Sequence, residues 1–167
     1  MRVLVLTGPP AVGKSTVGRL VAEHRPRCAL VDTDDVRHLV VGGHVAPWQG
    51  PEGRRQQRLG VQNACALACA LTGARFDVVV TDVLDEVTAA LYRDLLPDPL
   101  VVRLRVGYRE ALRRQRSRRI HLTWPEFRML HRREATFSAA DVSVETTGLS
   151  AKDTAERVAR LWSGPLG

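Results

Sequence analysis

Short apolar runs alternate along the chain with longer segments whose apolar residues recur at helical spacing. The first run, residues 3–7, is continuously apolar, which predicts a strand buried on both faces. Further runs predict strands at 29–31, 76–81, 100–106 and 142–146. Helical spacing predicts helices at 14–24, 56–71, 86–96, 108–118, 125–137 and 150–162. The Gly- and Pro-containing stretch 40–53 is predicted to be a loop.

Strand–helix alternation over the whole length predicts a parallel sheet covered by helices on both faces, in a single domain of residues 1–167. In such sheets, ligands bind at the C-terminal ends of the strands. The segments in which to search for a site are therefore 8–15, 32–35, 81–86 and the residues after Val106.

Composition narrows the class of protein. The 167 residues and the 44% hydrophobic content are typical of one globular domain. No apolar run approaches the ~20 residues that cross a bilayer, and the short first run predicts a strand rather than a signal peptide. Three cysteines at unrelated spacings predict neither a disulfide framework nor a zinc site. These features predict a cytoplasmic protein without a membrane span.

The formal net charge is +7, and every basic residue except Lys14 and Lys152 is an arginine or a histidine. Many of the arginines lie between Arg103 and Arg133. A surface for nucleic acid and an arginine-rich site for a polyphosphate both explain this charge. Aromatic residues make up only 5% of the chain, which gives no platform for stacked bases. A small molecule is therefore the expected partner, and nucleic acid is not.

The clearest motif is G-x-x-x-x-G-K-[ST], which lies between the first strand and the first helix. Its glycines let backbone N–H groups surround phosphate oxygens, and the helix N-terminus favours the same anion. Lys14 is expected to contact the outer phosphates as a catalytic residue, and Ser15 to bind Mg²⁺. ATP and Mg²⁺ are the expected cofactors. The predicted nucleotide-binding residues of this motif are Gly8, Pro9, Pro10, Ala11, Val12, Gly13, Lys14, Ser15 and Thr16.

This motif, together with Asp32-Thr33-Asp34, the Arg-rich segment after the fourth strand and the turn at 146–150, resembles the small P-loop kinases of metabolites. Shikimate kinase, gluconate kinase, chloramphenicol phosphotransferase and the tunicamycin-resistance ATP-binding protein share this plan. The resemblance implies the α/β fold class, as a P-loop NTPase three-layer sandwich. It also implies a five-stranded parallel sheet of order 2-3-1-4-5, a lid at about 113–125 and a substrate-binding insertion at about 35–60.

The Asp32-Thr33-Asp34 segment resembles the D-T-D of shikimate kinases. That resemblance implies that Asp32 helps to hold Mg²⁺ and that Asp34 contacts the acceptor hydroxyl. A carboxylate within hydrogen-bond reach can take the proton that the hydroxyl loses, so Asp34 is the expected catalytic base. The alternative is that Asp34 or Asp35 caps a helix over residues 36–41, and Asp35 is the residue expected to be the cap.

The chain departs from shikimate kinase at the end of the third strand. The glycine triplet that would face shikimate is absent, and Thr81-Asp82 stands there instead. Shikimate is therefore not the expected acceptor. Asp82 is expected to contact the substrate or to support Mg²⁺, and a loop carboxylate without such a role is the alternative.

Arginines recur on one face of the helix predicted at 108–118, at Arg109, Arg113 and Arg116. The resemblance implies that one lid arginine closes over the phosphates and that another stacks on adenine. Arg113 and Arg116 are predicted for these roles, with Arg116 catalytic, and Arg119 is a further nucleotide contact. A solvated basic face is the alternative.

Three residues of the predicted insertion and one of the predicted lid are candidate substrate contacts: His44, Trp48, Arg54 and Trp124. A Trp among glycines has little regular structure to pack on and can stack on a ring of a substrate. A loop packed on its own Trp, and a hydrophobic anchor at Trp124, are the alternatives.

The leading hypothesis is a kinase that transfers the γ-phosphoryl group of ATP to a hydroxyl of a small molecule. A self-resistance phosphotransferase acting on an antibiotic or a nucleoside is one form of it. Two other classes stay open: a polynucleotide 5′-kinase or other nucleic-acid-binding NTPase, and a regulatory NTPase without an acceptor. A GTPase is not expected, because the chain has no N-K-x-D segment.

Overall fold

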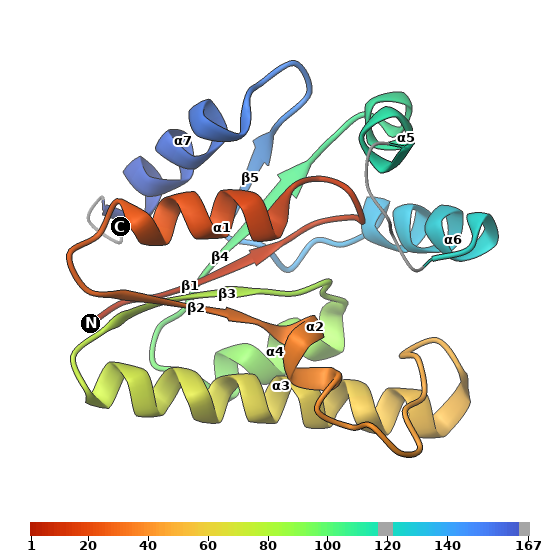
Figure 1. Cartoon of the computed structure of the whole chain (residues 1–167), viewed down its shortest axis with the longest axis horizontal. Helices are drawn as coiled ribbons and strands as arrows, with labels where there is room; N and C mark the ends of the chain where they lie inside the picture. Colours follow the sequence, from red (N-terminus) through yellow and green to blue (C-terminus); the bar gives the residue numbers. More distant parts are fainter. Residues whose placement is uncertain (117–121, 164–167) are drawn as a thin grey trace.

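A five-stranded parallel sheet forms the centre of the computed structural model, which describes residues 1–116 and 122–163, the side chain of Arg116 excepted (Figure 1). The strand order is β2-β3-β1-β4-β5, so the predicted order 2-3-1-4-5 and the α/β fold class are confirmed. The strands are β1 Val3–Thr7, β2 Cys28–Asp32, β3 Asp77–Thr81, β4 Leu100–Arg105 and β5 Val142–Glu145.

The central strand, β1, explains why the sheet has two cores. Leu6 pairs with Thr81 of β3 on one side and with Val102 of β4 on the other. Because side chains alternate along a strand, Val5 packs into the core under one face and Leu6 into the core under the other. Both cores are apolar, which is why the sequence of β1 is apolar at successive positions.

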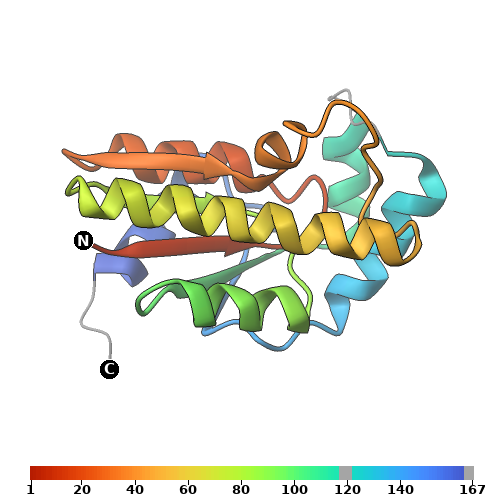
Figure 2. The same cartoon turned by 90° about the horizontal axis from the view of Figure 1, so that it is seen from below.

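The helices form the outer layers (Figures 1 and 2). Helices α1 Lys14–Glu23 and α7 Ala151–Ser163 cover one face of the sheet, and α3 Gly50–Gly73 and α4 Glu86–Leu95 cover the other. Short α2 Thr33–Arg37 follows β2, while α5 Tyr108–Arg116 and α6 Trp124–Ala135 lie beyond the C-terminal ends of the strands. Among the described residues, no helix combines the length and the apolar character that crossing a membrane requires.

The predicted loop at 40–53 is wrong at its C-terminal end, because α3 begins at Gly50. Pro51 is tolerated in the first turn of a helix, where its missing N–H would have no helical partner. Gly53 is needed there because an added Cβ would lie 2.1 Å from the carbonyl oxygen of Ala46. The close approach of the preceding loop therefore explains a glycine that sequence reasoning assigned to a loop.

Candidate active site

The loop between β1 and α1 has the backbone conformation of a phosphate cradle. Gly8, Ala11 and Gly13 all have positive φ, at 145°, 63° and 104°. Gly8 also lies against β4, where an added Cβ would come within 2.3 Å of the carbonyl oxygen of Leu104. The two glycines are thus required by backbone geometry, as the motif predicts.

Lys14 is the first residue of α1, and its side chain turns back to this loop. Its Nζ donates to the carbonyl oxygens of Gly8, at 2.9 Å, and Pro9, at 3.2 Å. Burial lowers the pKa of the Lys14 ammonium, and nearby carboxylates, Asp34 first among them, act in the opposite direction. The lysine is therefore within the electrostatic reach of the acidic segment that follows β2.

Ser15 and Asp32 meet across the ends of α1 and β2. The Ser15 hydroxyl donates to Oδ2 of Asp32 at 2.7 Å. A hydroxyl and a carboxylate oxygen side by side, next to a phosphate loop, are ligands that suit Mg²⁺. The donor set therefore fits the predicted metal.

The helix after β2 is capped by a different aspartate from the one predicted. Oδ1 of Asp32 accepts a hydrogen bond from the backbone N–H of Asp34 at 3.1 Å, and α2 begins at Thr33. Asp35 lies inside the helix, so the expectation that it caps the helix is wrong. The preference for Asp at an N-cap does not distinguish neighbouring aspartates. Asp32 is the N-cap because β2 ends at this residue and the helix begins at the next one.

Asp34 and Asp82 are joined by an arginine that sequence reasoning missed. Asp34 has 64% of its side chain exposed, and its Oδ1 accepts from Nη1 of Arg37 at 2.7 Å. Nη2 of the same arginine donates to Oδ1 of Asp82 at 2.6 Å. Arg37 and Asp34 are three residues apart on a helix, and this spacing is the sequence signal that could have predicted their ion pair.

Asp82 itself is buried, with no exposed side-chain surface. Its Oδ1 also accepts from the backbone N–H of Val83 at 2.7 Å, and its Oδ2 accepts from the hydroxyl of Tyr92 at 3.0 Å. Burial raises its pKa, and Arg37 opposes that shift. Its partner Arg37 keeps 10% of its side chain exposed, and the predicted contact of Asp82 with a substrate stays a prediction.

Helix α3 packs against the side chain of Arg37. An added Cβ at Gly60 would lie 2.7 Å from Cγ of Arg37, so the glycine leaves room for the arginine side chain. Nε of Arg37 is buried and has no hydrogen-bond partner among the described residues. The packing and the two ion pairs together fix the guanidinium between the carboxylates.

The predicted lid arginines are only partly within the described residues. Arg113 is exposed and pairs with Glu110 at 2.7 Å. The side chain of Arg116, and all of Arg119, lie outside the described residues. Arg114 was missed: its guanidinium donates to the carbonyl oxygens of Val12 and Thr146, each at 3.1 Å, and so joins the phosphate loop to the turn after β5.

The predicted substrate contacts lie on separate elements. Nε1 of Trp48 donates to Oε1 of Glu126 at 3.1 Å, which ties the loop before α3 to α6. Trp124 is 54% exposed, with its ring edge-on to Phe127. His44 is exposed with its ring beside His38, and Arg54 is exposed in the first turns of α3.

The chain is similar to a known sequence family and to a curated relative. Residues 4–134 match the family described as the AAA domain. Over 110 residues the chain is 39% identical to a shikimate kinase from Saccharopolyspora erythraea. That match covers 66% of this chain and 60% of the relative, so the chain spans less than two thirds of the relative's length.

Solved structures resemble the chain over nearly its whole length. A sugar kinase from Janibacter sp. HTCC2649 has a TM-score of 0.75 at 14% identity, covering 97% of this chain and 94% of its own. The tunicamycin resistance protein of Deinococcus radiodurans has a TM-score of 0.72 at 18% identity, covering 97% and 95%. At these identities the likeness shows the fold, and the predicted resemblance to small P-loop kinases is confirmed.

Proposed function

The chain belongs to the AAA domain family, and on this premise we propose that it is an ATP- and Mg²⁺-dependent kinase that phosphorylates a hydroxyl group of a small molecule. The observation that carries the proposal is that two nearby aspartates have different contacts. Asp32 contacts Ser15 of the phosphate loop, whereas Asp34 is exposed and held at one oxygen by Arg37. One carboxylate therefore serves the nucleotide side, and the other serves an acceptor.

The chemistry follows from this placement. Asp34 accepts the proton of the acceptor hydroxyl as that oxygen bonds to the γ-phosphorus of ATP, and the bond from phosphorus to the β,γ-bridging oxygen breaks. Lys14 and the backbone N–H groups of the loop stabilise the charge that develops on the phosphate oxygens. Ser15 and Asp32 would hold Mg²⁺, which neutralises charge on the outer phosphates when it is bound.

Arg37 supports the role of Asp34 by fixing its orientation. Because Oδ1 of Asp34 accepts from Arg37, we assign the contact with the acceptor hydroxyl to its second carboxylate oxygen. A bound and oriented carboxylate is a better base than a mobile one, since less ordering is needed in the transition state. Arg37 is in turn fixed by Asp82, so the buried pair positions the exposed base.

The proposal also concerns the chemical class of the molecule that accepts the phosphate. The curated relative is a shikimate kinase, and the solved structures include a sugar kinase and a tunicamycin resistance protein. Polyhydroxylated rings, nucleosides and antibiotics are therefore the acceptors to test. Thr81 and the buried Asp82, where a glycine triplet would face shikimate, support an acceptor other than shikimate.

The test is ATP turnover with Mg²⁺ in the presence of single acceptors: shikimate, hexoses, gluconate, nucleosides, chloramphenicol and tunicamycin. We expect turnover to rise with one chemical class, and mass spectrometry to find one phosphate on that acceptor. The Lys14→Ala variant is the control and should give no product. Turnover that ignores every acceptor would favour a regulatory NTPase, and phosphate on the 5′-hydroxyl of an oligonucleotide would favour a polynucleotide kinase.

A further inference from the structure

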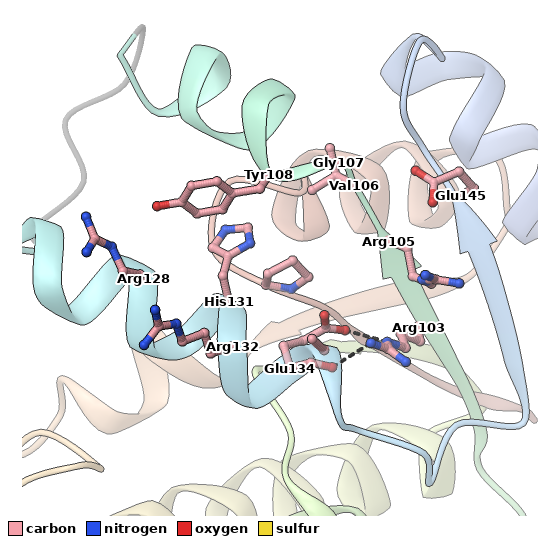
Figure 3. Close-up of a pocket in the computed structure, with 12 residues that line it drawn as sticks. Arg103, Arg105, Val106, Gly107, Tyr108, Arg128, His131, Arg132, Glu134 and Glu145 are labelled. Carbon is pink, nitrogen blue, oxygen red and sulfur yellow. Dashed lines mark hydrogen bonds and ion pairs between the residues drawn. The ribbon is translucent and has the colours of Figure 1, made fainter.

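A cavity of about 630 Å³ lies between the C-terminal ends of β4 and β5 and helix α6. Figure 3 shows charged side chains approaching it from both sides, with those of α6 opposite those of the two strands. None of these residues takes part in the proposed phosphoryl transfer. The charged residues that matter for its chemistry are Arg103, Arg105, Arg128, Arg132, Glu134 and Glu145.

The cavity is on the face of the sheet opposite α1 and α7. Leu104 of β4 packs in the core under those two helices. Since side chains alternate along a strand, Arg103 and Arg105 point to the other face. The strands β4 and β5 are also on the far side of β1 from β2 and β3, which lead to the aspartates of the proposed transfer site. The cavity therefore lies beside the phosphate loop, whose Pro9 is part of its lining, and on the side of β1 away from Asp32 and Asp34.

Part of the cavity lining is an ion pair with no net charge. Nε of Arg103 donates to Oε1 of Glu134 at 2.5 Å, and both side chains are almost completely buried. The same guanidinium donates to the carbonyl oxygens of Glu134 and Phe137, so its donors are turned to the protein (Figure 3). This pair fixes α6 on β4 and leaves little charge for a ligand.

The rest of the lining is strongly positive. Arg105, Arg128 and Arg132 are exposed, and among the described residues they form no hydrogen bond or ion pair. Glu145 is the second acidic group of the lining, besides Glu134, and its Oε1 already accepts from the Thr147 hydroxyl at 2.5 Å and from the backbone N–H of that residue. Three guanidinium groups around a hollow attract an anion with several oxygens, because each can form charge-assisted hydrogen bonds.

The remaining wall is aromatic and uncharged. His131 packs between the rings of Tyr108, at 5.3 Å, and Phe127, at 4.4 Å, and its Nε2 hydrogen-bonds to the carbonyl oxygen of Pro10 at 3.0 Å. Tyr108 and Pro9 line the cavity beside it. A ligand with an organic body can therefore pack on this wall while its anionic groups reach the arginines.

We propose that this cavity, next to the phosphate loop, is a second binding site that takes a small organic polyanion, a phosphate monoester or a polycarboxylate, while the nucleotide is bound. Two or three anionic oxygens contact Arg105, Arg128 and Arg132, and the organic part lies against Tyr108. The shared chemistry of the two ligand classes is a cluster of anionic oxygens on a small carbon skeleton. The site does not depend on the kinase activity proposed above.

The experiment is calorimetric titration of the full chain, saturated with Mg²⁺ and a non-hydrolysable ATP analogue, with phenyl phosphate in one arm and citrate in the other. The same titrations are made on Lys14→Ala without nucleotide, so that binding at the phosphate loop is excluded in a second way. We expect binding of at least one probe in both backgrounds. The probe that binds more tightly identifies the phosphate or the carboxylate class.

Two double variants locate the site. Arg105→Gln with Arg132→Gln should weaken binding about tenfold or more, the loss expected when charge-assisted contacts are removed. Arg157→Gln with Arg160→Gln makes the same change of charge on exposed positions of α7, on the other face, and should leave the affinity unchanged. The single variant Arg132→Glu is the second test of the same site, and its thermal melt checks the fold.

Three results would overturn the proposal: no binding of either probe in either background, equal weakening in the α7 control, or full affinity in both cavity variants. Equal weakening would show that the net charge of the protein attracts the anions. Full affinity in the cavity variants would place the ligand elsewhere.

Discussion

Nη2 of Arg37 lies 2.6 Å from Oδ1 of Asp82, a carboxylate that has no exposed surface. Ionised groups removed from water to this extent are tolerated when each has its partner. Tyr92 and the backbone N–H of Val83 complete the hydrogen bonds of Asp82. The pair is thus a fixed point of the structure, and Asp34 is attached to it through the other nitrogen of the same guanidinium.

Replacing Arg37 with methionine should lower the free energy of unfolding by about 3–5 kcal/mol, because Asp82 would be buried without its countercharge. Urea unfolding followed by circular dichroism measures the loss. The control is Arg93→Met, which breaks a partly exposed pair with Asp141 and should cost less than about 1 kcal/mol. The double variant Arg37→Met with Asp82→Asn should recover much of the stability. Similar losses in the two single variants would contradict the role of the buried pair.

Asp34→Asn should reduce acceptor-dependent turnover by about 10²-fold while leaving ATP binding nearly intact, because an amide cannot take the hydroxyl proton. The substitution keeps an oxygen that can accept from Arg37, so we expect the fold to be unchanged. Steady-state rates give the turnover, and calorimetry with a non-hydrolysable ATP analogue gives the affinity. Asp35→Asn, on the neighbouring exposed position, is the control and should retain activity. Near-normal turnover in Asp34→Asn would show that Asp34 is not the base.

The main features of the fold could be predicted from the sequence because they depend on patterns local to it. The apolar run at Val3–Thr7 and the glycines of the phosphate loop identify a buried strand and a phosphate cradle without knowledge of any neighbour. The hydrophobic pattern does not predict the strand order, which was inferred from the resemblance to P-loop kinases. It was confirmed by the structure.

The contacts of the site could not be predicted in the same way, because they join residues far apart along the chain. Arg37 and Asp82 are brought together by the pairing of β2 with β3. The space for Arg37 is set by Gly60 on α3. Arg114, to which sequence reasoning gave no role, joins the phosphate loop to the turn after β5, whereas the adjacent Arg113 is exposed and pairs with Glu110. The orientation of α5 distinguishes the two arginines.

Asp32→Asn should raise the Mg²⁺ concentration needed for half-maximal turnover by about tenfold, because a charged ligand is replaced by a neutral one. The amide oxygen can still accept from the backbone N–H of Asp34, so the cap of α2 is kept. Asp32→Ala removes both functions and should also lower the free energy of unfolding by about 1 kcal/mol. Magnesium titrations and urea unfolding separate the two effects. An unchanged Mg²⁺ requirement in both variants would exclude Asp32 from the metal site.

His131 should make the stability fall as the pH drops below about 6.5, the pKa of an unperturbed imidazole. Burial lowers the pKa of its imidazole in the folded chain, although the hydrogen bond to Pro10 acts in the opposite direction. The unfolded chain therefore binds the proton first as the pH falls, and protonation favours unfolding. In His131→Gln the amide can keep the hydrogen bond to Pro10 without titrating. We expect wild type to lose stability relative to this variant as the pH falls from 7 to 5, measured by urea unfolding at each pH. A difference between the two proteins that stays constant with pH would show that His131 is not the titrating group.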